Sequence, residues 1–172
     1  SNTENRKKGL PRSILMLTLN DKDTGAPLAY MSANILSAFR TGAVPGVGIK
    51  YFSREDSKVV GIVGPGVMSK TAFDAAMAVR DQIDTVKIKG RSQKSIDGFI
   101  QYVRDKYPQI KELIVVDTEE EAVRDADIVS IATSSPTGDP SLYSYIKEEW
   151  IKPGAILCCP AAARFDDDFI LN

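Results

Sequence analysis

Short apolar runs alternate with polar, helix-forming segments along most of the chain. From Lys58 onward the apolar runs are VVGIVG (59–64), TVKIKG (85–90), LIVVD (113–117), DIVSIAT (127–133) and GAILCCP (154–160). Segments with helical character separate them, over residues 67–81, 93–107, 119–124 and 142–149. Strands that alternate with helices in this way predict crossover units and a parallel sheet.

The Val and Ile content of these runs is nearly continuous, which is typical of strands buried on both faces. Right-handed crossovers then predict an α/β fold. We expect a Rossmann-type, doubly wound, mostly parallel sheet with helices on both faces.

The first part of the chain is patterned differently. The segment SILMLTLND (13–21) is predicted to be a strand, and the residue types of DKDTGAPLAY (21–30) predict a turn. The apolar residues of 31–44 have helical spacing, but Pro45 and its neighbouring glycines interrupt it. We expect one helix to about Arg40 and a second or kinked helix beginning near Thr41.

These patterns divide the chain. Residues 1–56 read as a polar leader with a strand and a helix that belong to an upstream domain, and residues 57–172 read as the α/β domain. Since nothing like a second catalytic domain follows the last strand, we expect the chain to be a piece of a longer enzyme.

Composition excludes several function classes. Lys and Arg total 22 against 23 Asp and Glu, without a basic stripe, so no nucleic-acid partner is expected. No apolar stretch is long enough for a membrane span. Histidine is absent, which removes Ser-His-Asp and Cys-His nucleophiles and most zinc sites, so no metal is expected. Cys158 and Cys159 are adjacent and point to opposite faces of a strand, which indicates free thiols in a reducing, cytoplasmic compartment.

The most informative turn is Gly64-Pro65-Gly66, which follows a buried strand and opens a helix. In a dinucleotide fold the first glycine makes the tight turn and the second lets the backbone approach the pyrophosphate. The helix start, with Val67 and Met68, then supplies N–H groups to the anion. Ser69 replaces the third glycine and is small enough for close packing. A plain tight turn is the alternative; we favour a cofactor phosphate.

The end of the second strand bears on the choice of cofactor. It carries Gly90, Arg91, Ser92 and Lys94, with no acidic residue before Asp97. NAD-binding proteins normally place Asp or Glu there for the ribose hydroxyls, whereas an arginine and a serine suit a 2′-phosphate. The alternative is a basic, solvated turn. We favour NADP over NAD.

A third candidate segment is TSSPTGDP (133–140), at the carboxyl end of the fourth strand. Thr133 and Ser134 could contact the ribose or the nicotinamide. Equally, the segment could be a loop with Asp139 and Ser141 near the next helix start.

Longer stretches resemble the ornithine cyclodeaminase/mu-crystallin family. These are SAFRTGAVPGVGIKYFSRED followed by VVGIVGPGVM, then EEAVRDADIVSIATSSPTGDP and WIKPGAILCCP, over roughly residues 28–165. Within the family, the sequence is most similar to the branch whose members are often labelled as a subunit of tyramine oxidase. The resemblance implies that residues 57–172 are an NAD(P)-binding domain and that an N-terminal domain serves substrate binding and dimerisation.

The resemblance also implies a homodimer that transfers hydride between an amino or imino acid and NAD(P). Arg40 matches the family arginine that binds the substrate carboxylate; from the residues alone, a helix-surface arginine is the simpler interpretation. The family usually places an Asp where this chain has Ala162, and the later run of Asp166, Asp167 and Asp168 reads as a solvated terminus.

The sequence is therefore compatible with two alternative functions. The first is an enzyme acting on an amino or imino acid, of which this chain is the cofactor domain and is inactive alone. The second is a noncatalytic, crystallin-like NADP-binding protein or accessory subunit. Arg40 favours the first and Ala162 the second. A Rossmann domain for another nucleotide-bearing ligand is a third interpretation, which the family match disfavours.

Overall fold

The computed structural model describes residues 4–11, 13–134 and 139–171. The chain forms two compact units, residues 1–40 and 41–172. In the described part, no helix is both long and apolar enough to cross a membrane.

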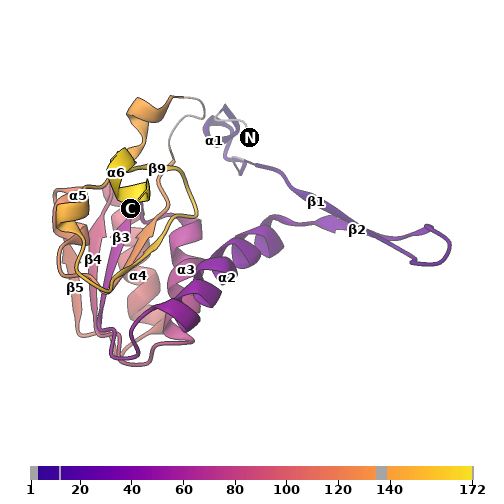
Figure 1. The fold of residues 1–172 in the computed structure, drawn as a ribbon. Helices are drawn as coiled ribbons and strands as arrows, with labels where there is room; N and C mark the ends of the chain where they lie inside the picture. The colour runs from indigo at the N-terminus through magenta and orange to yellow at the C-terminus, as the bar shows by residue number, and fades with distance from the viewer. Residues whose placement is uncertain (1–3, 12, 135–138, 172) are drawn as a thin grey trace. The chain divides into compact units, whose positions relative to one another are not determined.

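The first unit holds a short helix and a β-hairpin. Helix α1 (Glu4–Lys7) precedes strands β1 (Met16–Asn20) and β2 (Pro27–Ser32), which pair antiparallel (Figure 1). The prediction that residues 21–30 are all turn was wrong, because the chain reverses within a few residues. The Asp21 carboxylate accepts the N–H groups of Asp23 and Thr24, and Gly25 has φ +72°. The chain is therefore free to pair with β1 from Pro27 onward.

Helix α2 (Asn34–Phe52) is one continuous helix, so the predicted break or kink near Thr41 was wrong. Gly42, Pro45 and Gly46 are buried. A Cβ at Gly42 would lie 2.4 Å from the Thr71 carbonyl carbon, and one at Gly46 would lie 2.6 Å from the Ala75 Cβ. The small residues therefore let α2 pack closely on the next helix, and this contact supports a helix that local propensity disfavours.

Arg80 secures the end of α2. Its buried guanidinium donates hydrogen bonds to the carbonyl oxygens of Ile49, at 2.9 Å, and Ser53, also at 2.9 Å. These carbonyls belong to the helix end, where partners are missing and the dipole favours a cation. Helix α3 (Val67–Met77) ends before Arg80, and thus before residue 81, its predicted limit.

The centre of the second unit is a five-stranded parallel sheet in the order β5-β4-β3-β6-β8. The strands are β3 (Val59–Val63), β4 (Thr85–Lys89), β5 (Glu112–Val115), β6 (Ile128–Ile131) and β8 (Ile156–Cys158). The chain winds outward in one direction through β4 and β5 and then in the other through β6 and β8. This confirms the predicted Rossmann-type sheet.

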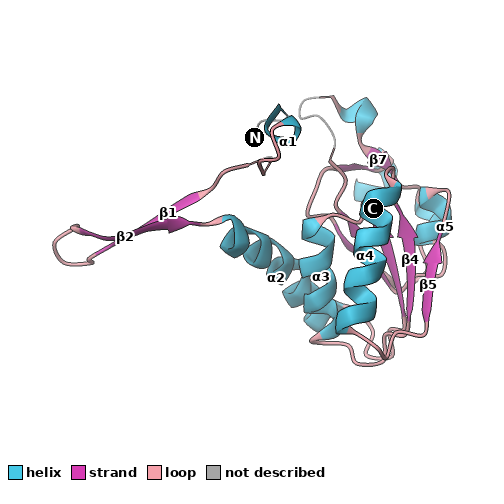
Figure 2. Ribbon diagram, turned by 180° about the vertical axis from the view of Figure 1, so that it is seen from behind, coloured by secondary structure: helices cyan, strands magenta, loops and turns pink. Residues whose placement is uncertain are grey.

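Helices cover both faces. Helices α3 and α4 (Gln93–Lys106) lie on one face, where Phe73 and Phe99 pack with the inward residues of the strands (Figure 2). Helix α5 (Glu119–Val123) packs on β3 and β4. A Cβ at Gly61 of β3 would lie 2.1 Å from the Ala122 carbonyl oxygen, so glycine is what lets α5 come this close.

The segment between β6 and β8 differs from the prediction of a helix over 142–149. It contains the short helices η1 (Pro140–Leu142) and η2 (Glu148–Trp150) around strand β7 (Ser144–Tyr145). Strand β7 pairs with β9 (Ala163–Arg164), which precedes α6 (Asp167–Leu171). Strand β7 forms because it pairs with a strand that is distant in sequence, and the spacing of apolar residues within 142–149 does not indicate such a partner.

Candidate functional site

The predicted cofactor residues fall on three adjacent strand ends. Val63, the last residue of β3, lies in register with Lys89 of β4 on one side and Ile131 of β6 on the other. Because parallel strands end at the same edge of the sheet, their following turns meet there. The structure thus brings together the segments 64–68, 90–94 and 133–134 at the carboxyl ends of the strands. Between β3 and β6 the strand order changes direction, which is where such sheets bind ligands.

Gly64 is tightly enclosed. It has φ +87°, and a Cβ there would lie 2.9 Å from the backbone atoms of Ala132 and Thr133. Its N–H donates to the Lys89 carbonyl oxygen at 2.9 Å. Only glycine combines this conformation with this proximity, so the first turn is held against the other two.

Pro65 and Gly90 join the first and second turns. Pro65 is buried, and a Cβ on Gly90 would lie 2.9 Å from the Pro65 Cγ and 2.8 Å from the Ile96 Cγ1. The bare backbone of Gly90 therefore receives the proline ring.

Gly66 is the opposite case. It is the exposed N-cap residue of α3, with φ −97° and ψ −167°, and a Cβ there would meet no atom within 4 Å. Its own N–H donates to the Gly64 carbonyl oxygen at 2.8 Å. The first intrahelical hydrogen bond of α3 is donated by the Lys70 N–H to the Gly66 carbonyl oxygen, at 3.2 Å. The N–H groups of Val67 and Met68, which the sequence predicted for the anion, therefore belong to the first turn, where N–H groups lack intrahelical partners. No acidic residue occupies the first turn of α3.

Ser69 was predicted only to allow close packing, but its side chain also makes a hydrogen bond within the turn. The side chain is fully buried, and its hydroxyl donates to the Gly64 carbonyl oxygen at 2.6 Å. Its spacing from the glycine turn was the only sequence signal.

The basic residues of the second turn point in different directions. The Lys89 ammonium donates to the Asp117 carbonyl oxygen, towards the β5 side. Arg91 is exposed, and its Nη2 donates to the Ser134 carbonyl oxygen at 3.2 Å, which joins the second turn to the third. Ser92 is the N-cap of α4 without a side-chain capping bond, and Lys94 is exposed. Arg91 is thus the cation that reaches across the strand ends.

The third turn is described only in part, since Ser135, Pro136, Thr137 and Gly138 lie outside the described residues. The Thr133 Oγ1 accepts from the buried Ser144 hydroxyl at 3.4 Å, a contact that sequence reasoning missed. Asp139 is the N-cap of η1, and its carboxylate accepts the Ser141 N–H at 3.0 Å.

The residues tied to substrate chemistry belong to other elements than these turns. Arg40 is exposed on α2 within the first unit. Ala162 is exposed just before β9, and Asp166, also exposed, accepts from the Tyr145 hydroxyl. Among the described residues, no group of three or more His, Cys, Asp or Glu could hold a metal.

Cys158 is the last residue of β8 and Cys159 follows it, at the same end of the sheet as the three turns. Cys158 is buried and Cys159 exposed, and both are free thiols. Burial raises the pKa of Cys158 to about 11 and also raises that of Cys159. Both are therefore protonated at neutral pH and are poor nucleophiles.

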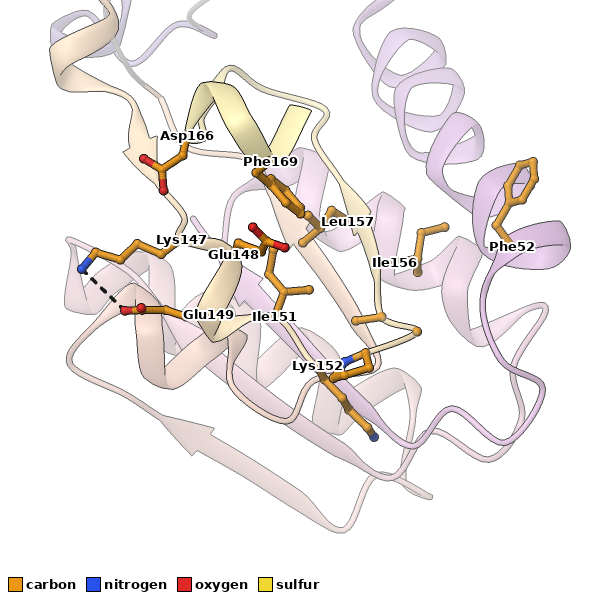
Figure 3. Close-up of a pocket in the computed structure, with 13 residues that line it drawn as sticks. Phe52, Lys147, Glu148, Glu149, Ile151, Lys152, Ile156, Leu157, Asp166 and Phe169 are labelled. Atoms are coloured by element: carbon orange, nitrogen blue, oxygen red, sulfur yellow. Dashed lines mark ion pairs between the residues drawn. The ribbon is translucent and has the colours of Figure 1, made fainter. Parts of the chain in front are cut away.

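A groove lies beside β8, the outer strand of the sheet (Figure 3). Its apolar lining includes Phe52, Leu157 and Phe169, and its Lys147 pairs with Glu149 at 3.7 Å. None of the predicted cofactor residues lines it.

Known proteins are similar to this chain in sequence and in fold. A family model described as the ornithine cyclodeaminase/mu-crystallin family matches residues 1–172. A Delta(1)-pyrroline-2-carboxylate reductase of Bacillus cereus is 34% identical over 134 residues, which is 78% of this chain and 40% of that protein. Alanine dehydrogenase of Archaeoglobus fulgidus is 33% identical over 154 residues, 90% of this chain and 44% of that protein.

Two solved structures are similar as well. The Thermococcus litoralis Delta(1)-pyrroline-2-carboxylate reductase in complex with NADH and L-proline has a TM-score of 0.78 and 34% identity, covering 91% of this chain and 46% of that one. An archaeal alanine dehydrogenase dimer with bound NAD has a TM-score of 0.78 and 32% identity, covering 91% and 45%. The chain thus spans less than half the length of these relatives. By the family match and by these identities, it belongs to the ornithine cyclodeaminase/mu-crystallin family.

Proposed function

We propose that this chain is an NAD(P)-binding domain and that it holds the cofactor across the ends of β3, β4 and β6. The observation that carries this is the contrast between the glycines. At Gly64 and Gly90, neighbouring atoms occupy the space that a Cβ would need, whereas at Gly66, at the start of α3, that space is open. A diphosphate in that space would meet the N–H groups of Val67 and Met68 and the positive end of the helix dipole.

The remaining turns complete the proposed cofactor site. The first turn, Gly64, Pro65 and Gly66, approaches the diphosphate, and Gly90, Arg91, Ser92 and Lys94 surround the adenosine ribose. Thr133 and Ser134 lie towards the second ribose and the nicotinamide. The solved relatives carry NADH or NAD.

NADP is the proposed preferred cofactor. Arg91 is exposed at this edge, and a carbonyl oxygen is its partner rather than a carboxylate. A 2′-phosphate can take over the guanidinium with a stronger, charge-assisted hydrogen bond. Lys89 contributes less because its ammonium is directed to Asp117.

For the whole protein we propose hydride transfer between an amino or imino acid and the cofactor, in a cytoplasmic homodimer. The names of the relatives support this, since they are a pyrroline-carboxylate reductase bound to L-proline and an alanine dehydrogenase. Arg40 is the proposed partner of the substrate carboxylate. The proposed boundary between upstream and cofactor domains stays at residues 56 and 57, and the tyramine oxidase branch stays a prediction.

A noncatalytic NADP-binding protein or accessory subunit is the second candidate. Ala162, at the position where the family usually has Asp, favours it because a methyl group cannot exchange a proton with a substrate amine.

Two measurements separate these functions. Calorimetry of this chain with NADPH and NADH tests the cofactor site, and absence of binding by both would refute it. A turnover screen of the longer protein against amino acids and cyclic imines, with both cofactors, tests the enzyme. Binding without turnover on any substrate supports the second candidate. The 172-residue chain alone should bind without turnover, because positioning of the substrate needs groups from the upstream domain.

A further inference from the structure

The carbonyl oxygen of Gly64 is held from two sides. It accepts the Gly66 N–H at 2.8 Å and the Ser69 hydroxyl at 2.6 Å. A carbonyl oxygen has two lone pairs, so both are engaged. The Ser69 side chain is fully buried beneath the turn, so its hydroxyl is shielded from water.

This carbonyl matters because of where it lies. Gly64 has φ +87°, and its peptide link to Pro65 joins β3 to the residues that open α3. A free carbonyl oxygen in such a turn is a negative dipole end close to the place where an anion would arrive. A bond from within the helix ties that oxygen down and fixes the orientation of the peptide.

A glycine or alanine at position 69 would allow the same close packing without this bond. The hydroxyl is therefore an addition to the space-saving role of the residue, and the carbonyl that it contacts belongs to the turn itself.

We propose that Ser69 is a positioning residue for the diphosphate of the cofactor. Its hydroxyl holds the Gly64 carbonyl away from the ligand and keeps the N–H groups of Val67 and Met68 directed at it. The inference rests on the proposed cofactor site and concerns one subsite of it, the diphosphate.

The test compares ligands with and without a diphosphate. Displacement of fluorescent NADPH (or NADH, whichever binds more tightly) measures the affinity of ADP and of adenosine for wild type, Ser69→Ala and Ser69→Gly. Both variants should bind ADP about three- to tenfold more weakly, the equivalent of one neutral hydrogen bond, with adenosine unchanged. Thermal melts ensure that every variant is folded at the temperature used.

Thr71→Val is the matched control. Thr71 is also buried on α3, and its hydroxyl donates to the Met68 carbonyl oxygen at 3.1 Å within the helix. This variant should lose stability without selective loss of ADP affinity.

Unchanged ADP affinity in Ser69→Ala, or equal losses for ADP and adenosine, would overturn the proposal while leaving the cofactor site intact. A wild-type chain that binds no dinucleotide would overturn the cofactor site and this inference together.

Discussion

Replacing Gly66 by valine should weaken dinucleotide binding strongly and leave the fold nearly unchanged. The backbone of Gly66 is extended, at φ −97° and ψ −167°, which a β-branched residue adopts readily. No atom outside the adjacent residues lies within 4 Å of a Cβ built there, so the valine side chain extends into the space assigned to the diphosphate.

The magnitude follows from the groups that lose their partner. Charge-assisted hydrogen bonds contribute about 1.5–3 kcal/mol each. Loss of one such bond from Val67 or Met68 weakens binding about tenfold, and loss of both weakens it about a hundredfold or more. The fold should lose only the small advantage of glycine over valine as an N-cap, about 0.5–1 kcal/mol.

Gly64→Ala is the contrasting variant, two residues away in the same turn. The positive φ of +87° costs about 1–2 kcal/mol, and the steric clash of a Cβ only 2.9 Å from backbone atoms of Ala132 and Thr133 costs about 1–3 kcal/mol more. The melting temperature should fall by roughly 4–20 °C at 2–4 °C per kcal/mol. Calorimetric titration with NADPH and NADH, together with thermal melts of both variants, measures the two effects separately.

Gly66→Val binding as tightly as wild type would refute the placement of the diphosphate at the start of α3. A Gly66→Val chain that melts as early as Gly64→Ala would refute the open space on which the reasoning depends.

Four further predictions concern other contacts in the structure. In calorimetry, Arg91→Ala should lower NADPH affinity about tenfold or more and leave NADH affinity nearly unchanged. Arg91→Asp should reverse the preference between the two cofactors. Equal affinities of the wild-type chain for NADPH and NADH would contradict both expectations. Gly42→Ala should lower the free energy of unfolding in urea by about 1–3 kcal/mol, because its Cβ would lie 2.4 Å from the Thr71 carbonyl carbon. Gly48→Ala on the same helix should be neutral or stabilising, since its Cβ would lie 3.7 Å from the Ile156 Cδ1, an ordinary contact. Burial raises the pKa of Asp127, but hydrogen bonds from Lys152 and from the N–H groups of Lys58 and Val59 outweigh it and lower the pKa. That stabilisation is present above the unfolded-state pKa and is lost as the pH falls through the folded-state value, so urea melts between about pH 5 and pH 2 should show a steeper loss for wild type than for Asp127→Asn. Burial and then the hydrogen bond to Asp74 raise the pKa of Tyr107 from 10.0 to about 12, so the stabilisation from its neutral form is full below about pH 10 and is lost as the pH rises through about 12. Tyr107→Phe should flatten that alkaline loss in urea melts, and an unchanged slope would contradict the assignment.

The sequence alone determined the α/β architecture of residues 58–160. Strands buried on both faces must be apolar throughout, so VVGIVG, TVKIKG and DIVSIAT were visible without a structure. Gly64-Pro65-Gly66 marked the turn after the first of them, because a tight strand-to-helix turn needs glycine locally. The family was likewise readable from contiguous stretches.

Tertiary structure decided whatever depends on contacts between distant residues. Helix α2 continues through Pro45 because Gly42 and Gly46 pack on α3, and β7 forms because β9 supplies its partner. At the candidate site, Gly66 and Gly64 look alike in sequence, yet a Cβ at Gly66 would enter open space and a Cβ at Gly64 would clash with the backbone of Ala132. The Ser69 hydroxyl finds its acceptor only once the turn has closed over it. Backbone preferences are local and leave a pattern in the chain, whereas packing and hydrogen-bond partners arise only when the folded backbone brings separate segments together.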